Sequence, residues 1–201
     1  LTRATDGTLY ITDMGNNGNA RRDLGIYVLP EPNPLAIAET RALTFLPVAY
    51  PDQQRFPASV WHFDCEAVFY SNDKLYLLTK HRKPGEITGW ESGSKLYRLD
   101  TQYTDRTNVL TLVGESDELA LATAADLSPD GQHLAVLTYL GVWLFRRPAE
   151  GDNWLSGESR FISLSREQLK TSEALTWQDS QSLLIANEEA ELLQLDVAEL
   201  P

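Results

Sequence analysis

The sequence is poor in the residues that disulfide frameworks, zinc sites and nucleic-acid contacts require. Its 201 residues include a single cysteine, Cys65. One cysteine excludes an intrachain disulfide framework, and the usual Cys/His spacings of zinc sites are absent. Basic residues are also scarce, because 17 lysines and arginines stand against 29 acidic residues and the formal net charge is −12. A nucleic-acid partner is therefore not expected, since phosphate binding needs a basic face, and the charge favours a cation or a basic partner.

Long apolar runs and the motifs of several enzyme classes are missing as well. No apolar run approaches the roughly 18 to 20 residues that cross a bilayer, so no membrane span is expected. The N-terminal residues lack the basic and apolar regions of a signal peptide, but the chain begins with Leu1, and a signal or anchor removed upstream is compatible with this start. There is no Walker A motif, no dinucleotide fingerprint and no G-x-S-x-G nucleophile elbow.

The sequence does contain an internal repeat. Four segments share a pattern in which a polar turn is followed by a strand rich in Leu, Val, Ile or Tyr, and they span residues 1–13, 68–80, 127–139 and 175–187. Thr12, Thr79 and Thr138 occupy the same position in three of them. A third strand is expected after every segment, and a fourth after three of them. Repeated sets of four antiparallel strands predict the blades of a β-propeller.

We therefore expect an all-β chain with one propeller domain over residues 1–201 and blades at approximately 1–50, 62–115, 121–165 and 171–201. The first copy lacks most of an inner strand and the last lacks an outer strand. This pattern predicts a segment of a longer ring, of about five or six blades, without its N-terminal part. A β-sandwich or an irregular antiparallel sheet is the alternative. A short helix with Ser165 as its N-cap is expected at "SREQLK".

Acidic residues stand just before three of the predicted inner strands. They are Glu66, Asp126 and Glu173. The innermost strand of each propeller blade lines the central channel, so these carboxylates are expected to converge at one end of it. Calcium, a hard cation that takes oxygen ligands, is the metal expected among them. In the alternative interpretation, each acid caps the backbone of the neighbouring blade.

The stretch "WHFDCEA" holds the candidates for catalysis. It places His62 and Asp64 beside Glu66, and a histidine with two carboxylates is able to act as a base or as a metal ligand. The alternative role for His62 is a hydrogen bond between blades.

Other polar residues are expected at the mouth of the channel, because they end equivalent strands or lie in adjoining loops. Together they form a chemically mixed surface that suits a polar ligand better than a single metal ion. The candidate ligand-binding residues are Asp13, Asn16, Asn17, Lys80, His81, Arg82, Tyr139 and Asn187.

Four stretches carry a resemblance to a known group: "TLYITDMGNNGNARRDLGIYVLPEP", "DCEAVFYSNDKLYLLTKH", "AADLSPDGQHLAVLTY" and "SEALTW". Through them the chain resembles bacterial β-propellers that are similar to the phytase-like and NHL-type propellers. The resemblance implies a propeller fold and export to the periplasm or the cell exterior. Asp13, Asn16 and Asn17 match the D-x-G-D-N pattern of that group, with Asn16 in place of the usual Asp, and this change weakens an implied metal site.

These observations favour a non-enzymatic module that binds a small molecule or a protein at the channel mouth or at the loop-rich face. The alternative is a calcium-dependent hydrolase of the phosphoesterase or lactonase type. In that enzyme the metal polarises the substrate and lowers the pKa of a bound water, and a channel carboxylate or His62 accepts the proton. A purely structural module is the third possibility.

Overall fold

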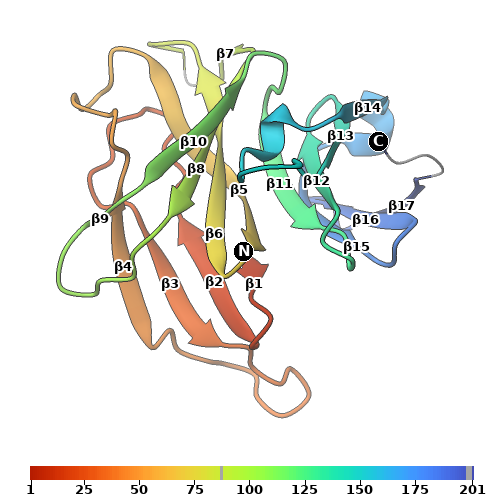
Figure 1. Cartoon of the computed structure of the whole chain (residues 1–201), viewed down its shortest axis with the longest axis horizontal. Helices are drawn as coiled ribbons and strands as arrows, with labels where there is room; N and C mark the ends of the chain where they lie inside the picture. Colours follow the sequence, from red (N-terminus) through yellow and green to blue (C-terminus); the bar gives the residue numbers. More distant parts are fainter. Residues whose placement is uncertain (87, 198–200) are drawn as a thin grey trace.

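The chain forms four small β-sheets that are arranged as the blades of a β-propeller (Figure 1). The structure, a computed structural model, describes residues 1–86, 88–197 and 201. Its two helical segments are a 3₁₀ turn at Trp154–Ser156 and helix α1 at Arg166–Leu169, within the described residues. The predicted all-β propeller is confirmed.

Each blade is built from consecutive antiparallel strands. The first contains β1 (Thr2–Arg3), β2 (Thr8–Asp13), β3 (Gly25–Pro30) and β4 (Thr44–Ala49). The second contains β5 (Trp61–Ser71), β6 (Lys74–Arg82), β8 (Ser94–Leu99) and β10 (Thr111–Ser116), with β7 (Trp90–Glu91) beside β6. The third contains β11 (Ala122–Leu127), β12 (His133–Thr138), β13 (Gly141–Arg146) and β14 (Ser159–Ser163). The fourth contains β15 (Ser172–Trp177), β16 (Ser182–Asn187) and β17 (Leu192–Asp196).

One short strand departs from the repeat. Strand β9 (Asn108–Val109) lies in the sequence between two strands of the second blade, yet it pairs in parallel with β4 of the first. Buried Asn108 fixes this crossing, because its side-chain amide donates to the carbonyl of Pro47, 3.0 Å away. The predicted blade boundaries and the single domain stay predictions.

The core is divided into three apolar layers, one between each pair of neighbouring blades. Alternation along a strand sends successive side chains to opposite layers. In β8, for example, Tyr97 and Leu99 pack toward the first blade, whereas Leu96 packs toward the third. The second and third blades are thus apolar on both faces, and stacking of the sheets positions the inner strands around the axis.

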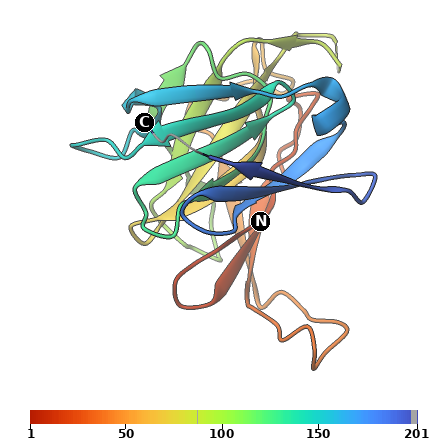
Figure 2. The same cartoon turned by 90° about the vertical axis from the view of Figure 1, so that its right-hand side faces the viewer.

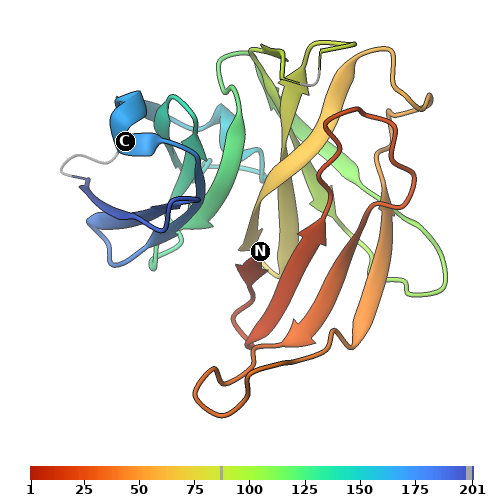
Figure 3. The same ribbon diagram turned by 180° about the vertical axis from the view of Figure 1, so that it is seen from behind.

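Surface decorations lie where prolines and capping residues predict them. The segment 31–43, between β3 and β4, projects beyond the end of the first blade (Figure 1, Figure 2 and Figure 3), and its Leu35 is 96% exposed. The predicted helix is present as α1, and the Ser165 hydroxyl accepts a hydrogen bond from the Gln168 backbone N–H at 3.2 Å.

No helix in the described ranges combines the length and the hydrophobicity that crossing a membrane requires.

Candidate functional site in the central channel

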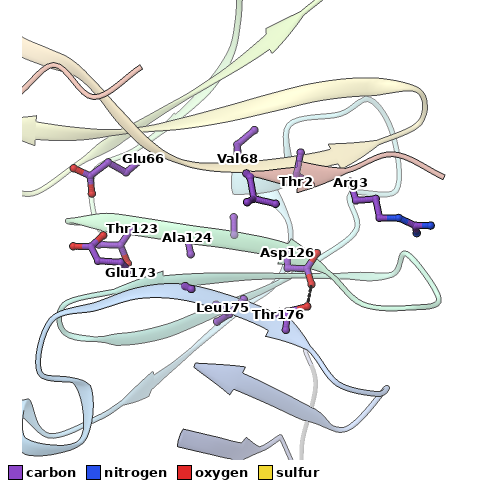
Figure 4. A pocket seen from close by; sticks show the side chains of 13 residues that line it. Thr2, Arg3, Glu66, Val68, Thr123, Ala124, Asp126, Glu173, Leu175 and Thr176 are labelled. Atoms are coloured by element: carbon purple, nitrogen blue, oxygen red, sulfur yellow. Dashed lines mark hydrogen bonds between the residues drawn. The ribbon is translucent and has the colours of Figure 1, made fainter. Parts of the chain in front are cut away.

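A cavity of about 450 Å³ lies where the innermost strands of the four blades meet (Figure 4). Its middle is lined by small or apolar side chains, and polar groups stand at both ends. The lining comes from the first residue and from β1, β5, β11 and β15, and consists of Leu1, Thr2, Arg3, Glu66, Val68, Thr123, Ala124, Ala125, Asp126, Glu173, Ala174, Leu175 and Thr176.

Three of the lining residues occupy β-bulges of the inner strands. The register with the second strand shifts at Glu66 in β5, at Thr123 in β11 and at Glu173 in β15. A bulge places one extra residue outside the regular pairing and re-aims its side chain. Glu66, Thr123 and Glu173 lie together at one end of the cavity (Figure 4).

Both glutamates at this end have a protein partner from another strand. Glu66 accepts a hydrogen bond from Nζ of Lys80, whose side chain is fully buried. Glu173 accepts one from the hydroxyl of Tyr139, and Nζ of Lys80 lies 5.0 Å from the Tyr139 ring. The resulting chain Glu66–Lys80–Tyr139–Glu173 connects the second, third and fourth blades.

Burial changes the proton affinity of this network. It raises the pKa of Glu66, against the opposing effect of Lys80, and the nearby Glu173 carboxylate adds to the rise. Burial and the hydrogen bond to Glu173 likewise raise the pKa of the Tyr139 hydroxyl, which stays protonated as a donor. Glu66 accepts the hydrogen bond from Lys80, and Glu173 the one from Tyr139, through a single carboxylate oxygen each. The second oxygen of each glutamate is therefore the natural acceptor for a ligand in the cavity.

Asp126 lies at the other end of the cavity, away from the two glutamates (Figure 4). One of its oxygens accepts hydrogen bonds from the Thr176 hydroxyl at 2.9 Å and from the Trp177 backbone N–H at 3.0 Å. Burial raises the pKa of Asp126, and these hydrogen bonds oppose the rise. Asp126 therefore joins the third blade to the fourth, as the capping alternative describes.

Asp126 is separated from the glutamates because the turn between the first two long strands is longer in the third blade than in the second. Leu78 and Leu137 are equivalent in the repeat, and they lie opposite Ala67 and Ala124 respectively. The residue equivalent to Glu66 is therefore Thr123, a lining residue that the sequence analysis missed. The position of Asp126 corresponds to that of Phe69.

The three candidates for catalysis, His62, Asp64 and Glu66, contact different residues and do not form one group. The His62 ring stacks on His81 with centroids 3.6 Å apart, and its Nε2 is 3.5 Å from the Glu91 carboxylate. Asp64 is fully buried and forms an ion pair with Arg82 at 3.0 Å. Glu66 points into the channel toward Lys80.

Asp64 also anchors the loop that contains Asn16. Its carboxylate accepts a hydrogen bond from the Asn16 backbone N–H at 2.7 Å. The Asn19 side chain accepts from the Phe63 N–H at 2.8 Å, and Asn19 has a φ of 49°. The stretch 13–19 is thus a clamp between the first and second blades, and buried Asn16 belongs to that clamp.

The remaining ligand-binding candidates are only partly brought together. Lys80 and Tyr139 are neighbours, as described above. Asp13 forms an ion pair with Arg21 at 2.7 Å, and the Asn187 amide donates to Glu191 at 3.0 Å within its own turn. Exposed Asn17 accepts a hydrogen bond from Arg82 at 2.8 Å.

No group of three or more His, Cys, Asp or Glu side chains in the described ranges is arranged to hold a metal ion. The role of Glu66, Asp126 and Glu173 as calcium ligands stays a prediction.

No model of a known protein family matches the chain, and no curated protein matches it either. Solved structures do match. Hsv2 of Kluyveromyces lactis is 15% identical with a TM-score of 0.38, and the match covers 97% of this chain and 60% of the Hsv2 chain. A proposed 6-phosphogluconolactonase from Bacteroides uniformis ATCC 8492 is 12% identical with a TM-score of 0.36, and the match covers 98% of this chain and 83% of that one. Likenesses this distant identify no activity, so the function is argued from the site.

Proposed function

We propose that the chain is a ligand-binding propeller module whose central cavity takes a small molecule rich in hydrogen-bond donors, such as hydroxyl or amine groups. The observation that carries this proposal is the cavity itself, with two glutamates at one end. Its volume of about 450 Å³ is of the size that small-molecule sites have. Glu66 and Glu173 offer acceptor oxygens to this space.

The contacts of the glutamates support a binding role. Lys80 and Tyr139 hold the carboxylates in place, so little side-chain freedom is lost when a ligand binds. Lys80 itself is fully buried and does not reach the ligand. The apolar middle of the cavity, formed by residues such as Val68 and Leu175, suits a ligand with a carbon skeleton.

The calcium-dependent hydrolase receives less support from the same residues. A metal that activates water needs several ligands on one side and an open position. Glu66 and Glu173 are the two carboxylates at one end, whereas Asp126 lies at the other and binds the Trp177 N–H.

Isothermal titration calorimetry with three probes tests the proposal: myo-inositol as a polyol, putrescine as an amine, and calcium chloride. The variant Ala174→Phe fills the cavity without breaking an ion pair, because Ala174 is exposed to it. Glu173→Gln removes one charge and keeps an oxygen for Tyr139. Glu39→Gln, on the projecting segment 31–43, is the matched control.

We expect saturable binding of inositol or putrescine that Ala174→Phe abolishes, that Glu173→Gln weakens by roughly tenfold, and that Glu39→Gln leaves unchanged. Binding of calcium without either organic probe would instead favour the hydrolase. If no probe binds, or if binding survives in Ala174→Phe, the proposed site is wrong.

A further inference from the structure

A second, smaller cavity lies within the first blade, at the end of β4. It has a volume of about 140 Å³, and none of its lining residues belongs to the channel cavity. Leu24, Val48 and Tyr50 form its buried apolar wall. Cavities of about 150 Å³ with apolar walls accommodate a benzene ring.

The guanidinium of Arg22 stands at this cavity without an ion-pair partner among the described residues. The Arg22 guanidinium lies over the Phe56 ring, 4.1 Å from its centroid, and both residues line the cavity. The neighbouring Arg21 is held by Asp13 and Asp23. Arg22 is exposed, and its contact within the described residues is this stacking on Phe56 rather than an ion pair or a hydrogen bond.

Two of the lining residues, Gln53 and Tyr50, carry buried polar groups. The Gln53 amide donates to the carbonyl of Asn19 at 3.0 Å, which fixes the loop that closes the cavity. The hydroxyl of Tyr50 is buried and has no hydrogen-bond partner within the described part of the chain. Buried polar groups without a partner are rare in folded proteins and call for an explanation.

We propose that this cavity is a second ligand site, for a carboxylate with a compact apolar body about the size of a benzene ring. The body packs between the apolar wall and Phe56, and the carboxylate meets the guanidinium of Arg22. Arginine is well suited to this task, because its planar fork binds a carboxylate through two parallel hydrogen bonds. Stacking on Phe56 holds the guanidinium at the rim before the ligand arrives.

Ligand-observed NMR and calorimetry on the full chain test this site with benzoate, and with benzamide as its neutral isostere. Arg22→Gln removes the charge at an exposed position, so the variant is expected to fold. Arg41→Gln removes another exposed arginine, on the projecting segment 31–43 and outside the cavity, and is the matched control.

We expect saturable benzoate binding, with benzamide weaker by about tenfold or more. Arg22→Gln should weaken benzoate binding to a similar degree, whereas Arg41→Gln and the channel variant Ala174→Phe should not change it. The proposal is overturned if benzoate does not bind, if benzamide binds equally well, or if Arg22→Gln and Arg41→Gln behave alike. Because the channel variant is included, failure of this site is distinguishable from failure of the channel site.

Discussion

Replacement of Asp64 by alanine is predicted to destabilise the protein strongly. The Asp64 side chain is fully buried, and it accepts hydrogen bonds from Arg82 Nε at 3.0 Å and from the Asn16 N–H at 2.7 Å. The first bond joins β5 to β6 within the second blade, and the second links this blade to the loop of the first. The change to alanine leaves a guanidinium nitrogen and a backbone N–H in a largely dry environment without their acceptor.

The size of the effect follows from these contacts. Removal of one partner of a buried ion pair costs about 3–5 kcal/mol, because the other charge stays buried. Arg82 is 11% exposed and keeps its hydrogen bond to Asn17, so we expect a loss within this range rather than above it. Asp64→Asn keeps an acceptor oxygen for the Asn16 N–H, and we expect about half of the loss.

Urea unfolding followed by tryptophan fluorescence measures the loss. With a denaturant slope of about 2 kcal/mol/M, Asp64→Ala should lower the midpoint by roughly 2 M. The matched control is Asp23→Ala, which removes a far more exposed acid from its pair with Arg21 and should shift the midpoint little. Equal shifts in the two variants would refute the structural role assigned to Asp64.

Three further predictions concern backbone geometry and protonation. Asn19→Ala removes two buried hydrogen bonds at a position with a φ of 49°. We expect chemical denaturation to show a free energy of unfolding lower by about 3 kcal/mol. Asn19→Gly should lose about 1 kcal/mol less, because glycine tolerates this φ. Burial, with the nearby charges of His62 and Lys95, lowers the pKa of His81 from 6.5 to about 4. Between these pH values the unfolded chain therefore binds more protons than the folded one, so the free energy of unfolding should fall as the pH drops from about 6.5 to about 4. The fall should be smaller in His81→Gln. A midpoint near 6.5 for the titration of the His81 ring, measured by NMR, would contradict this. Gly141→Ala would place a Cβ 2.1 Å from the carbonyl oxygen of Ile162, at a position with a φ of +147°. We expect a lower melting temperature and a loss of about 2 kcal/mol or more in the free energy of unfolding. In the control Gly15→Ala, the new Cβ meets no atom within 4 Å, so this variant should melt like the parent.

The propeller architecture could be predicted because it depends on local, repeated patterns. The second strands of the repeats share their register, and Thr79 and Thr138 pair with Cys65 and Ala122 at the same relative place. The helix at Ser165 was predictable for the same reason, since a capping box is a signal contained within four residues.

The arrangement of the acids was not predictable from spacing alone. Strands β5 and β6 are joined by two residues, Asn72 and Asp73, whereas five residues, 128–132, join β11 and β12. When the repeats are aligned on their turns, the inner strands of the second and third blades are therefore shifted relative to one another. Asp126 then appears as the counterpart of Glu66, whereas the true counterpart is Thr123. A bulge adds to the difficulty, because the extra residue has no sequence signal of its own.

Contacts between distant segments were also beyond the sequence pattern. The buried pair of Asp64 and Arg82 joins two strands, and its second bond reaches back 48 residues to Asn16. The parallel pairing of β9 with β4 likewise depends on the approach of two segments that carry no shared periodicity. Such contacts are decided by tertiary packing, which a one-dimensional pattern does not contain.

Because the bulge residues of the inner strands lie outside the regular strand pairing, the side chains that line one end of the channel do not determine the pairing of the sheets. A residue that stands outside the ladder can be exchanged while the pairs on either side and the apolar layers keep their places. The third blade already carries such an exchange, since Thr123 presents a hydroxyl where the second and fourth blades present Glu66 and Glu173. Substitutions at these three positions therefore change the ligand preference of the channel without disturbing the strand pairing, provided that the contacts of each side chain, such as Lys80 beside Glu66 and the Ser172 carbonyl beside Thr123, are replaced with it.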